Sequence, residues 1–107
     1  MKVYISLPIS NRPETEAREH ADRVKAALSR AGHTPVNPFE IYHGKDADSI
    51  DRLSNNLRAL HSCDAIYLSE NWQFSRECRI EANFAREYGK EIMYERKTAQ
   101  DDYYFNR

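Results

Sequence analysis

Hydrophobic residues along the chain follow two alternating spacings, and each spacing predicts one kind of element. Short runs with apolar residues at every second position, rich in Val, Ile and Tyr, predict β-strands. The predicted strands are Lys2–Leu7, His33–Val36, Asp64–Ser69 and Lys90–Tyr94. Between them, apolar residues recur at the three- and four-residue spacing of a helix. The segments with this spacing are Asn11–Ala31, Ser49–Leu60 and Ser75–Tyr88.

The ends of the predicted helices carry their own signals. Asn11, Ser49 and Ser75 are of the residue types that cap helix N-termini. Gly32 and Gly89 are placed to end the first and third helices. Strands and helices that alternate with short connections predict a parallel sheet covered by helices on both faces.

This pattern defines the fold class and the domain organisation that we expect. The fold is α/β, a flavodoxin- or Rossmann-like three-layer sandwich with about four parallel strands in the order 2-1-3-4. One domain is expected over residues 1–95, followed by a polar C-terminal tail over residues 96–107.

Composition and charge exclude several classes of partner. The chain has 107 residues, of which 31% are charged, and a formal net charge of −1. It lacks the basic footprint of a protein that binds a nucleic-acid polymer. No apolar run approaches the length that crosses a bilayer. We therefore expect a cytoplasmic protein that contacts neither nucleic acid nor membrane.

Polar residues gather where the parallel strands end, which is where such sheets bind ligands. The segments that meet there are Leu7–Arg12, Asn37–Glu40, Ser69–Phe74 and the first turns of the third helix. Because free N–H groups at helix N-termini favour anions, a ligand with a phosphate or sugar hydroxyl fits this edge. The candidate binding residues in these segments are Ser10, Asn11, Arg12, Asn37, Ser69 and Ser75.

One carboxylate of the third helix lies on the wrong side for a solvated charge. At about 100° per residue, Glu81 falls close to the apolar face formed by Cys78, Ala82 and Ala85. A buried charge without partners is costly. Glu81 is therefore our candidate catalytic residue, unless it forms an ion pair with an Arg or keeps its tip in water.

The sequence lacks the motifs of nucleotide-binding loops and of metal sites. The isolated glycines form neither a dinucleotide fingerprint nor a Walker loop. Cys63 and Cys78 have no metal-type spacing and are expected to be small buried hydrophobic residues. His20, His33, His43 and His61 show no ligand spacing and are interpreted as surface or loop residues. We expect no metal and no cofactor.

The ordered set of motifs resembles the nucleoside 2-deoxyribosyltransferase superfamily, in particular its bacterial and phage branch of domains of unknown function. The matching pieces are "VYISLPIS", "AGHTPVNPFE", "CDAIYLSENW" and "S-x5-E-x3-A-x3-GKEIMYE". The resemblance implies that the helix glutamate, Glu81, attacks the anomeric carbon of a nucleoside and displaces the base. Water or a second base then completes hydrolysis or transfer. The resemblance also implies a homodimer or larger assembly.

The expected chemistry needs supporting groups. An ionised nucleophile needs hydrogen-bond donors, and Tyr4 and Ser6 are placed to supply them. The leaving base needs a proton or hydrogen bonds. The superfamily often has an aspartate for this task where this chain has Asn56, which can bind a base but cannot donate a proton by ordinary acid catalysis. Leu7 and Glu77 also replace glycines of the family pattern and narrow the approach to a phosphate.

Three hypotheses follow from these residues. The first is an enzyme that hydrolyses or transfers the N-glycosidic bond of a nucleoside or nucleotide. The second is a binding module that keeps the pocket for a nucleotide-like ligand without turnover, which Asn56 and Glu77 favour. The third is an interaction domain in which Tyr103–Phe105 dock on a partner or on a second subunit.

Overall fold

A five-stranded sheet forms the centre of the computed structural model, which describes residues 1–97 and 103–106. The strands are β1 (Lys2–Ser6), β2 (Thr34–Val36), β3 (Ala65–Leu68), β4 (Glu91–Lys97) and β5 (Tyr103–Asn106). Their order is β2-β1-β3-β4-β5. The first four strands pair in parallel, as predicted from the sequence. The α/β fold and the parallel order 2-1-3-4 are therefore confirmed.

The fifth strand was not predicted. β4 continues to Lys97, and β5 pairs with it in the antiparallel direction, with Glu95 opposite Phe105. The sequence predicts a polar tail over residues 96–107, because these residues are polar apart from Tyr103–Phe105. An edge strand is paired on one side only and can form without alternating apolar positions. The structure describes the backbone of Tyr103–Phe105 and not the surroundings of their side chains, so their docking on a partner stays a prediction.

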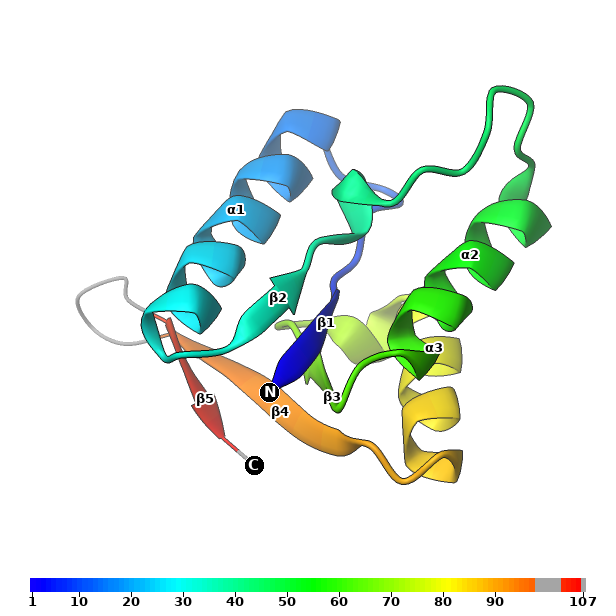
Figure 1. Cartoon of the computed structure of the whole chain (residues 1–107). Coiled ribbons are helices and arrows are strands. Elements are labelled where there is room, and N and C mark those ends of the chain that lie inside the picture. Colours follow the sequence, from blue (N-terminus) through cyan, green and yellow to red (C-terminus); the bar gives the residue numbers. More distant parts are fainter. Residues whose placement is uncertain (98–102, 107) are drawn as a thin grey trace.

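Helices cover both faces of the sheet (Figure 1). α1 (Glu14–Arg30) lies on one face, and α2 (Ser49–His61) and α3 (Arg76–Glu87) lie on the other. Short 3-10 turns, η1 (Pro38–Glu40) and η2 (Trp72–Phe74), follow β2 and β3. These turns and the loop after β1 stand at the carboxyl ends of the parallel strands.

Alternation along β1 divides its side chains between two cores. Val3 and Ile5 belong to the cluster under α1, and Tyr4 belongs to the cluster under α2 and α3. Ser6 is two residues from Tyr4 and therefore faces α3 as well. This alternation aims two hydroxyl groups, those of Tyr4 and Ser6, at α3.

The first helix begins differently from the prediction. Pro13 occupies the N-cap position of α1 without a side-chain cap, and Asn11 has a φ of 65°. Asn11 is therefore not the N-cap of α1. It occupies a left-handed turn, a conformation that Asn tolerates better than most residues.

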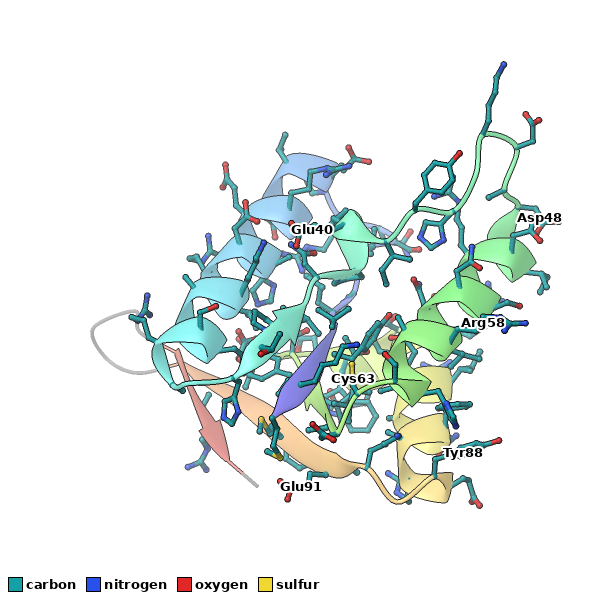
Figure 2. All side chains as sticks on the ribbon, viewed as in Figure 1. Glu40, Asp48, Arg58, Cys63, Tyr88 and Glu91 are labelled. Carbon is teal, nitrogen blue, oxygen red and sulfur yellow. The ribbon has the colours of Figure 1, made fainter. Side chains whose placement is uncertain are left out.

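The second helix also begins with a different cap. Its N-cap is Asp48, not Ser49, and Asp48 and Asp51 form a reciprocal capping box with N···O distances of 2.8 and 3.1 Å. Figure 2 shows Asp48 at the start of α2. Ser75 caps α3 as predicted, since its Oγ accepts from the backbone N–H of Cys78. Within the described residues, no helix has the length and apolar character needed to cross a membrane.

Candidate active site

Two hydroxyl groups of β1 hold the carboxylate of Glu81. Tyr4 donates to Oε2 and Ser6 donates to Oε1, both at 2.7 Å. Glu81 is only 4% exposed, and it lies in the second turn of α3, above the end of β1. The structure thus brings both expected donors to the candidate nucleophile, and the inward orientation inferred from helical spacing is confirmed.

The surroundings of Glu81 change its acidity. Burial raises the pKa of the Glu81 carboxyl to about 7, although the hydrogen bonds from Tyr4 and Ser6 act in the opposite direction. The nearby charge of Glu77 adds to the rise. Burial also raises the pKa of Tyr4, so the phenol keeps its proton and remains a donor. At neutral pH the ionised and protonated forms of Glu81 are therefore both populated, and burial disfavours the anion. A carboxyl group perturbed in this way is typical of groups that take part in chemistry.

A small pocket opens at Glu81. It has a volume of about 70 Å³, and Leu7, Asn56, Ser75 and Glu77 line it together with Glu81. This volume is too small for a whole nucleoside. Leu7 and Glu77 are part of the pocket's lining, and their predicted narrowing of the approach to a phosphate stays a prediction.

Two wider cavities adjoin this pocket and share lining residues with it. The first, of about 880 Å³, shares Ser10, Ser75 and Glu77 with the small pocket. The second, of about 840 Å³, shares Ser10, Asn56 and Glu77. Glu81 thus lies where a ligand can extend to both sides. We call the first the arginine cavity, because its wall includes Arg12, Arg23, Arg76 and Arg79.

The second wide cavity has a different character. Phe39, Tyr42 and Ile80 line part of it, and Asn56 lies at its boundary with the Glu81 pocket. The Oδ1 atom of Asn56 is buried and has no hydrogen-bond partner. A buried acceptor without a partner is costly, and it accepts a hydrogen bond from any suitable group that enters. We call this space the Asn56 cavity.

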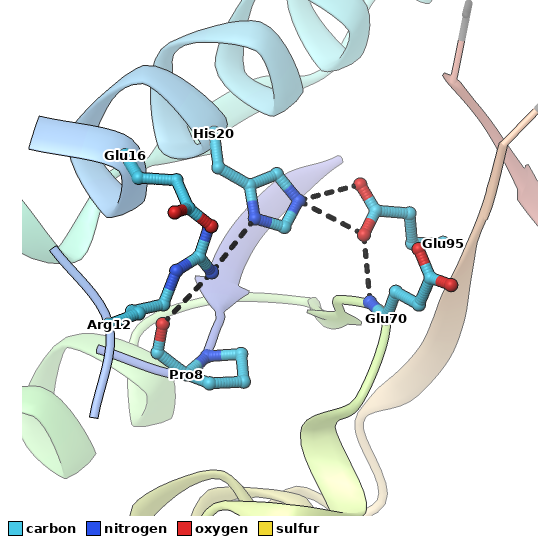
Figure 3. Close-up of polar contacts among 6 residues, drawn as sticks. All are labelled: Pro8, Arg12, Glu16, His20, Glu70 and Glu95. Atoms are coloured by element: carbon cyan, nitrogen blue, oxygen red, sulfur yellow. Dashed lines mark hydrogen bonds and ion pairs between the residues drawn. The ribbon is translucent and has the colours of Figure 1, made fainter. Parts of the chain in front are cut away.

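A buried network that was not predicted from the sequence lies at the arginine cavity (Figure 3). His20 is only 7% exposed, so its interpretation as a surface or loop residue is wrong. Its Nε2 lies 2.9 and 3.0 Å from the carboxylate oxygens of Glu95, and its Nδ1 lies 3.2 Å from Nη1 of Arg12. A signal was present, because His20 lies between Ala17 and Ala21 on the buried stripe of α1.

The remaining candidate binding residues differ in position. Ser10, Asn11, Arg12 and Ser75 line the arginine cavity together. Asn37 is buried, and its side chain accepts from the backbone N–H of Phe39, so it caps η1 and lines none of the three cavities. Ser69 is fully buried, and its Oγ has no partner. Most of the predicted binding residues therefore line the cavities, whereas Asn37 and Ser69 are buried and line none of the three.

The cysteines and possible metal ligands add no second chemistry. Cys63 and Cys78 are free thiols buried in the core, as predicted. Burial raises the pKa of Cys63, and it raises the pKa of Cys78 to about 11, so both thiols stay protonated at neutral pH. Among the described residues, no group of three or more His, Cys, Asp or Glu side chains is arranged to hold a metal ion.

Residues 1–94 match the family model described as a domain of unknown function, DUF4406. The chain therefore belongs to this family. No curated protein matches the sequence.

Solved structures with the same fold include three nucleoside-processing proteins. The 2-deoxyribosyltransferase from Bacillus psychrosaccharolyticus has a TM-score of 0.65 at 20% identity, over 88% of this chain and 71% of that chain. The CMP N-glycosidase BcmB from Clostridium botulinum has a TM-score of 0.62 at 16% identity, over 88% and 67%. The 2-desoxiribosyltransferase from Leishmania mexicana has a TM-score of 0.59 at 23% identity, over 92% and 69%. At these identities the likeness establishes the fold.

Proposed function

We propose that the protein cleaves the N-glycosidic bond of a nucleoside or nucleotide, with Glu81 as the nucleophile. The observation that carries this proposal is the buried Glu81 carboxylate, held by two neutral hydroxyl groups beside an open pocket. None of the ion pairs among the described residues includes Glu81. Two of its fold neighbours are deoxyribosyltransferases and one is a CMP N-glycosidase, and that agrees with such chemistry.

The proposed reaction has two steps. In the first, a carboxylate oxygen of Glu81 forms a bond to the anomeric carbon, and the C–N bond breaks with its electron pair on the departing base. Tyr4 and Ser6 hold the carboxylate so that one oxygen faces the sugar. In the second, water or an N–H nitrogen of another base attacks the same carbon and releases Glu81 as a carboxylate, and the proton that the attacking group loses is taken up by the displaced base. The first acceptor gives hydrolysis, and the second gives transfer.

The wide cavities suggest how the substrate is placed. The base enters the Asn56 cavity, where the unpartnered Oδ1 of Asn56 accepts a hydrogen bond from a base N–H group. The sugar lies at the Glu81 pocket. In a nucleotide, the phosphate lies in the arginine cavity, where Arg12 supplies a cation and Ser10 and Ser75 supply hydroxyl groups.

The second candidate function is a binding module without turnover, and two observations favour it. The space at Glu81 is only about 70 Å³. Asn56 offers no proton to the leaving base. An Asn56→Asp variant separates the two functions, because an acid at this position should raise the rate of base release about tenfold in an enzyme and should leave a binding module inactive.

The direct test measures free base by chromatography after incubation with a panel of deoxynucleosides and their 5′-monophosphates. We expect release by the wild type and a loss of at least about 1,000-fold in Glu81→Gln. Glu87→Gln is the matched control, since Glu87 is an exposed glutamate on the same helix. No release from any substrate, or equal release by Glu81→Gln, contradicts the enzyme. Ligand-dependent thermal stabilisation without release supports the binding module.

We also propose that the protein forms a homodimer or a larger assembly. Exposed hydrophobic side chains support this proposal, because Phe74 borders the arginine cavity, and Tyr42 and Ile50 border the Asn56 cavity. A second subunit over these rims would bury them and narrow the open cavities. A monomer in light scattering at micromolar concentration contradicts this proposal.

A further inference from the structure

The network of Arg12, His20 and Glu95 joins three parts of the fold that are distant in sequence. Arg12 lies in the loop after β1, His20 lies on α1, and Glu95 lies on β4 (Figure 3). The side chain of Glu95 is 1% exposed and that of His20 is 9% exposed. Side chains this deeply buried hold one geometry, so the network fixes the positions of its members relative to one another.

Hydrogen bonding determines the tautomer of His20. The guanidinium of Arg12 is always a donor, so the Nδ1 atom that faces it at 3.2 Å must be the acceptor. With Nδ1 as the acceptor, the N–H group at Nε2 donates to the Glu95 carboxylate at 2.9 Å. His20 therefore transmits the position of Glu95 to Arg12 through a directed chain of two hydrogen bonds.

Glu95 also holds a second wall of the arginine cavity. Its Oε1 accepts from the backbone N–H of Glu70 at 2.7 Å. Glu70 and Asn71 line that cavity just after β3. One carboxylate on β4 thus supports Arg12 on one side and the loop after β3 on the other.

Arg12 itself is held on several sides, and one of its donors is buried without a partner. Its Nη1 also donates to the carbonyl oxygen of Pro8 at 3.2 Å, and its Nη2 pairs with Glu16 at 3.0 Å. The Nε atom is buried and has no partner. Glu16 is 59% exposed, and exposed ion pairs hold a side chain weakly. The buried contact to His20 is therefore the stronger constraint on the guanidinium.

We propose that His20 and Glu95 are positioning residues that set Arg12 in the wall of the arginine cavity to receive the anionic group of a nucleotide substrate. This inference rests on the proposed function. It adds that a residue of β4, outside all three cavities, controls affinity for the substrate's anionic group through His20.

The test is a double-mutant cycle on binding, which needs no turnover. The probe is 2-deoxyribose 5-phosphate, and its Kd is measured by calorimetry for the wild type, Arg12→Gln, Glu95→Ala and the double variant. We expect each single change to weaken binding about tenfold, the size of a lost hydrogen bond to a charged group. The double variant should bind no more weakly than Arg12→Gln alone, because Glu95 acts through Arg12.

Controls separate positioning from general damage to the fold. Glu91→Ala removes an exposed carboxylate of the same strand and should leave Kd unchanged. Binding of 2-deoxyribose without phosphate should not differ among the variants. If Glu95→Ala fails to fold, His20→Asn gives the same cycle, since its side chain is too short to span Glu95 and Arg12.

The tautomer of His20 provides a second readout. Nitrogen-15 NMR of the imidazole ring should show Nε2 protonated and Nδ1 unprotonated in the wild type. The inference is overturned if the two changes have additive effects on Kd, or if Glu95→Ala leaves Kd unchanged. It is also overturned if Nδ1 carries the proton, or if the wild type does not bind the sugar phosphate. Coupled binding effects in a protein that releases no base would retain the positioning role and contradict the proposed reaction.

Discussion

Glu81 and Glu95 have buried carboxylates near the carboxyl ends of the parallel strands. Their surroundings shift the pKa values of the two groups in opposite directions. Glu81 lies on α3, faces β1 and accepts hydrogen bonds from two neutral hydroxyl groups, those of Tyr4 and Ser6. Glu95 bonds to His20 on α1 and to the backbone N–H of Glu70. The pKa of Glu81 is raised to about 7, mainly by burial. Burial also acts to raise the pKa of Glu95, but the His20 and Glu70 hydrogen bonds outweigh it and lower the value.

This difference supports Glu81 as the proposed nucleophile and Glu95 as the proposed supporting group. A carboxylate that gains little from its surroundings as an anion has more to gain by bonding to a carbocation-like sugar. A carboxylate that is well stabilised as an anion is a poor nucleophile and a good anchor. Burial alone does not distinguish Glu81 from Glu95, whereas the groups that donate hydrogen bonds to each carboxylate do.

The largest expected effect is a pH-dependent change in the free energy of unfolding when Glu81 is replaced by Gln. The pKa of Glu81 is about 7 in the folded protein and about 4.5 when unfolded. Between these values the folded state holds the extra proton, so the free energy of unfolding falls as pH rises. Glu81→Gln removes this loss. Its stability relative to wild type should therefore rise by about 3 kcal/mol between pH 4 and pH 8. Urea unfolding at both pH values measures it, and parallel curves for the two proteins contradict the raised pKa.

Glu95→Gln should change stability with the opposite sign. The folded pKa of Glu95 is below its ordinary value, so its contribution is present above that value and is lost as pH falls through the folded pKa. We expect a loss of about 2 kcal/mol at pH 8, the size of a charge-assisted hydrogen bond. The loss should shrink in acid. The same unfolding series provides the measurement, and a variant as stable as wild type at pH 8 would mean that the His20 contact contributes nothing.

Tyr4→Phe removes one of the two hydrogen-bond donors to the Glu81 carboxylate, so the pKa of Glu81 should move further from that of Glu95. The change should raise the pKa of Glu81 by about one unit, equivalent to about 1.4 kcal/mol. Because the carboxylate is the reactive form, the pH at which the rate of base release is half-maximal should move upward by the same amount. A rate–pH profile at saturating substrate measures the shift. An unchanged midpoint would show that a different group limits the reaction.

Glu77→Gln should have the smallest effect. Glu77 is partly exposed, and its charge is the last of the causes that raise the pKa of Glu81. Its removal should lower that pKa by a few tenths of a unit, because water screens exposed charges. High salt should reproduce the shift in the wild type. A shift of a full unit would indicate that repulsion, and not burial, dominates the acidity of Glu81.

Much of the fold and part of the site follow from the sequence for definite physical reasons. Strand alternation placed Tyr4 and Ser6 on one face of β1, and helical spacing turned Glu81 inward. These inferences use local periodicity, which the chain cannot avoid once the elements form. The same periodicity places His20 on the buried stripe of α1, whereas the spacing of the four histidines indicates no metal site and gives no sign of its buried partners.

Other features depend on contacts that no local pattern encodes. Glu95 has its role because β4 continues past Tyr94 and carries it toward α1, 75 residues from His20 in sequence. Asn37 was expected at the ligand, but the local 3-10 turn takes its side chain as a cap. β5 forms because β4 presents a free edge, not because its own sequence alternates.

We propose that the Glu81 carboxylate becomes bonded to the sugar, and the most direct test of this nucleophile is to trap that bond. A deoxynucleoside analogue with fluorine at the sugar 2′ position slows breakdown of the ester, because fluorine destabilises the positive charge of the second step. The protein is incubated with the analogue, quenched in acid, digested and examined by mass spectrometry. We predict one sugar group on the peptide that contains Glu81, absent in Glu81→Gln. Base release with the sugar on another residue, or undiminished in Glu81→Gln, would contradict the account.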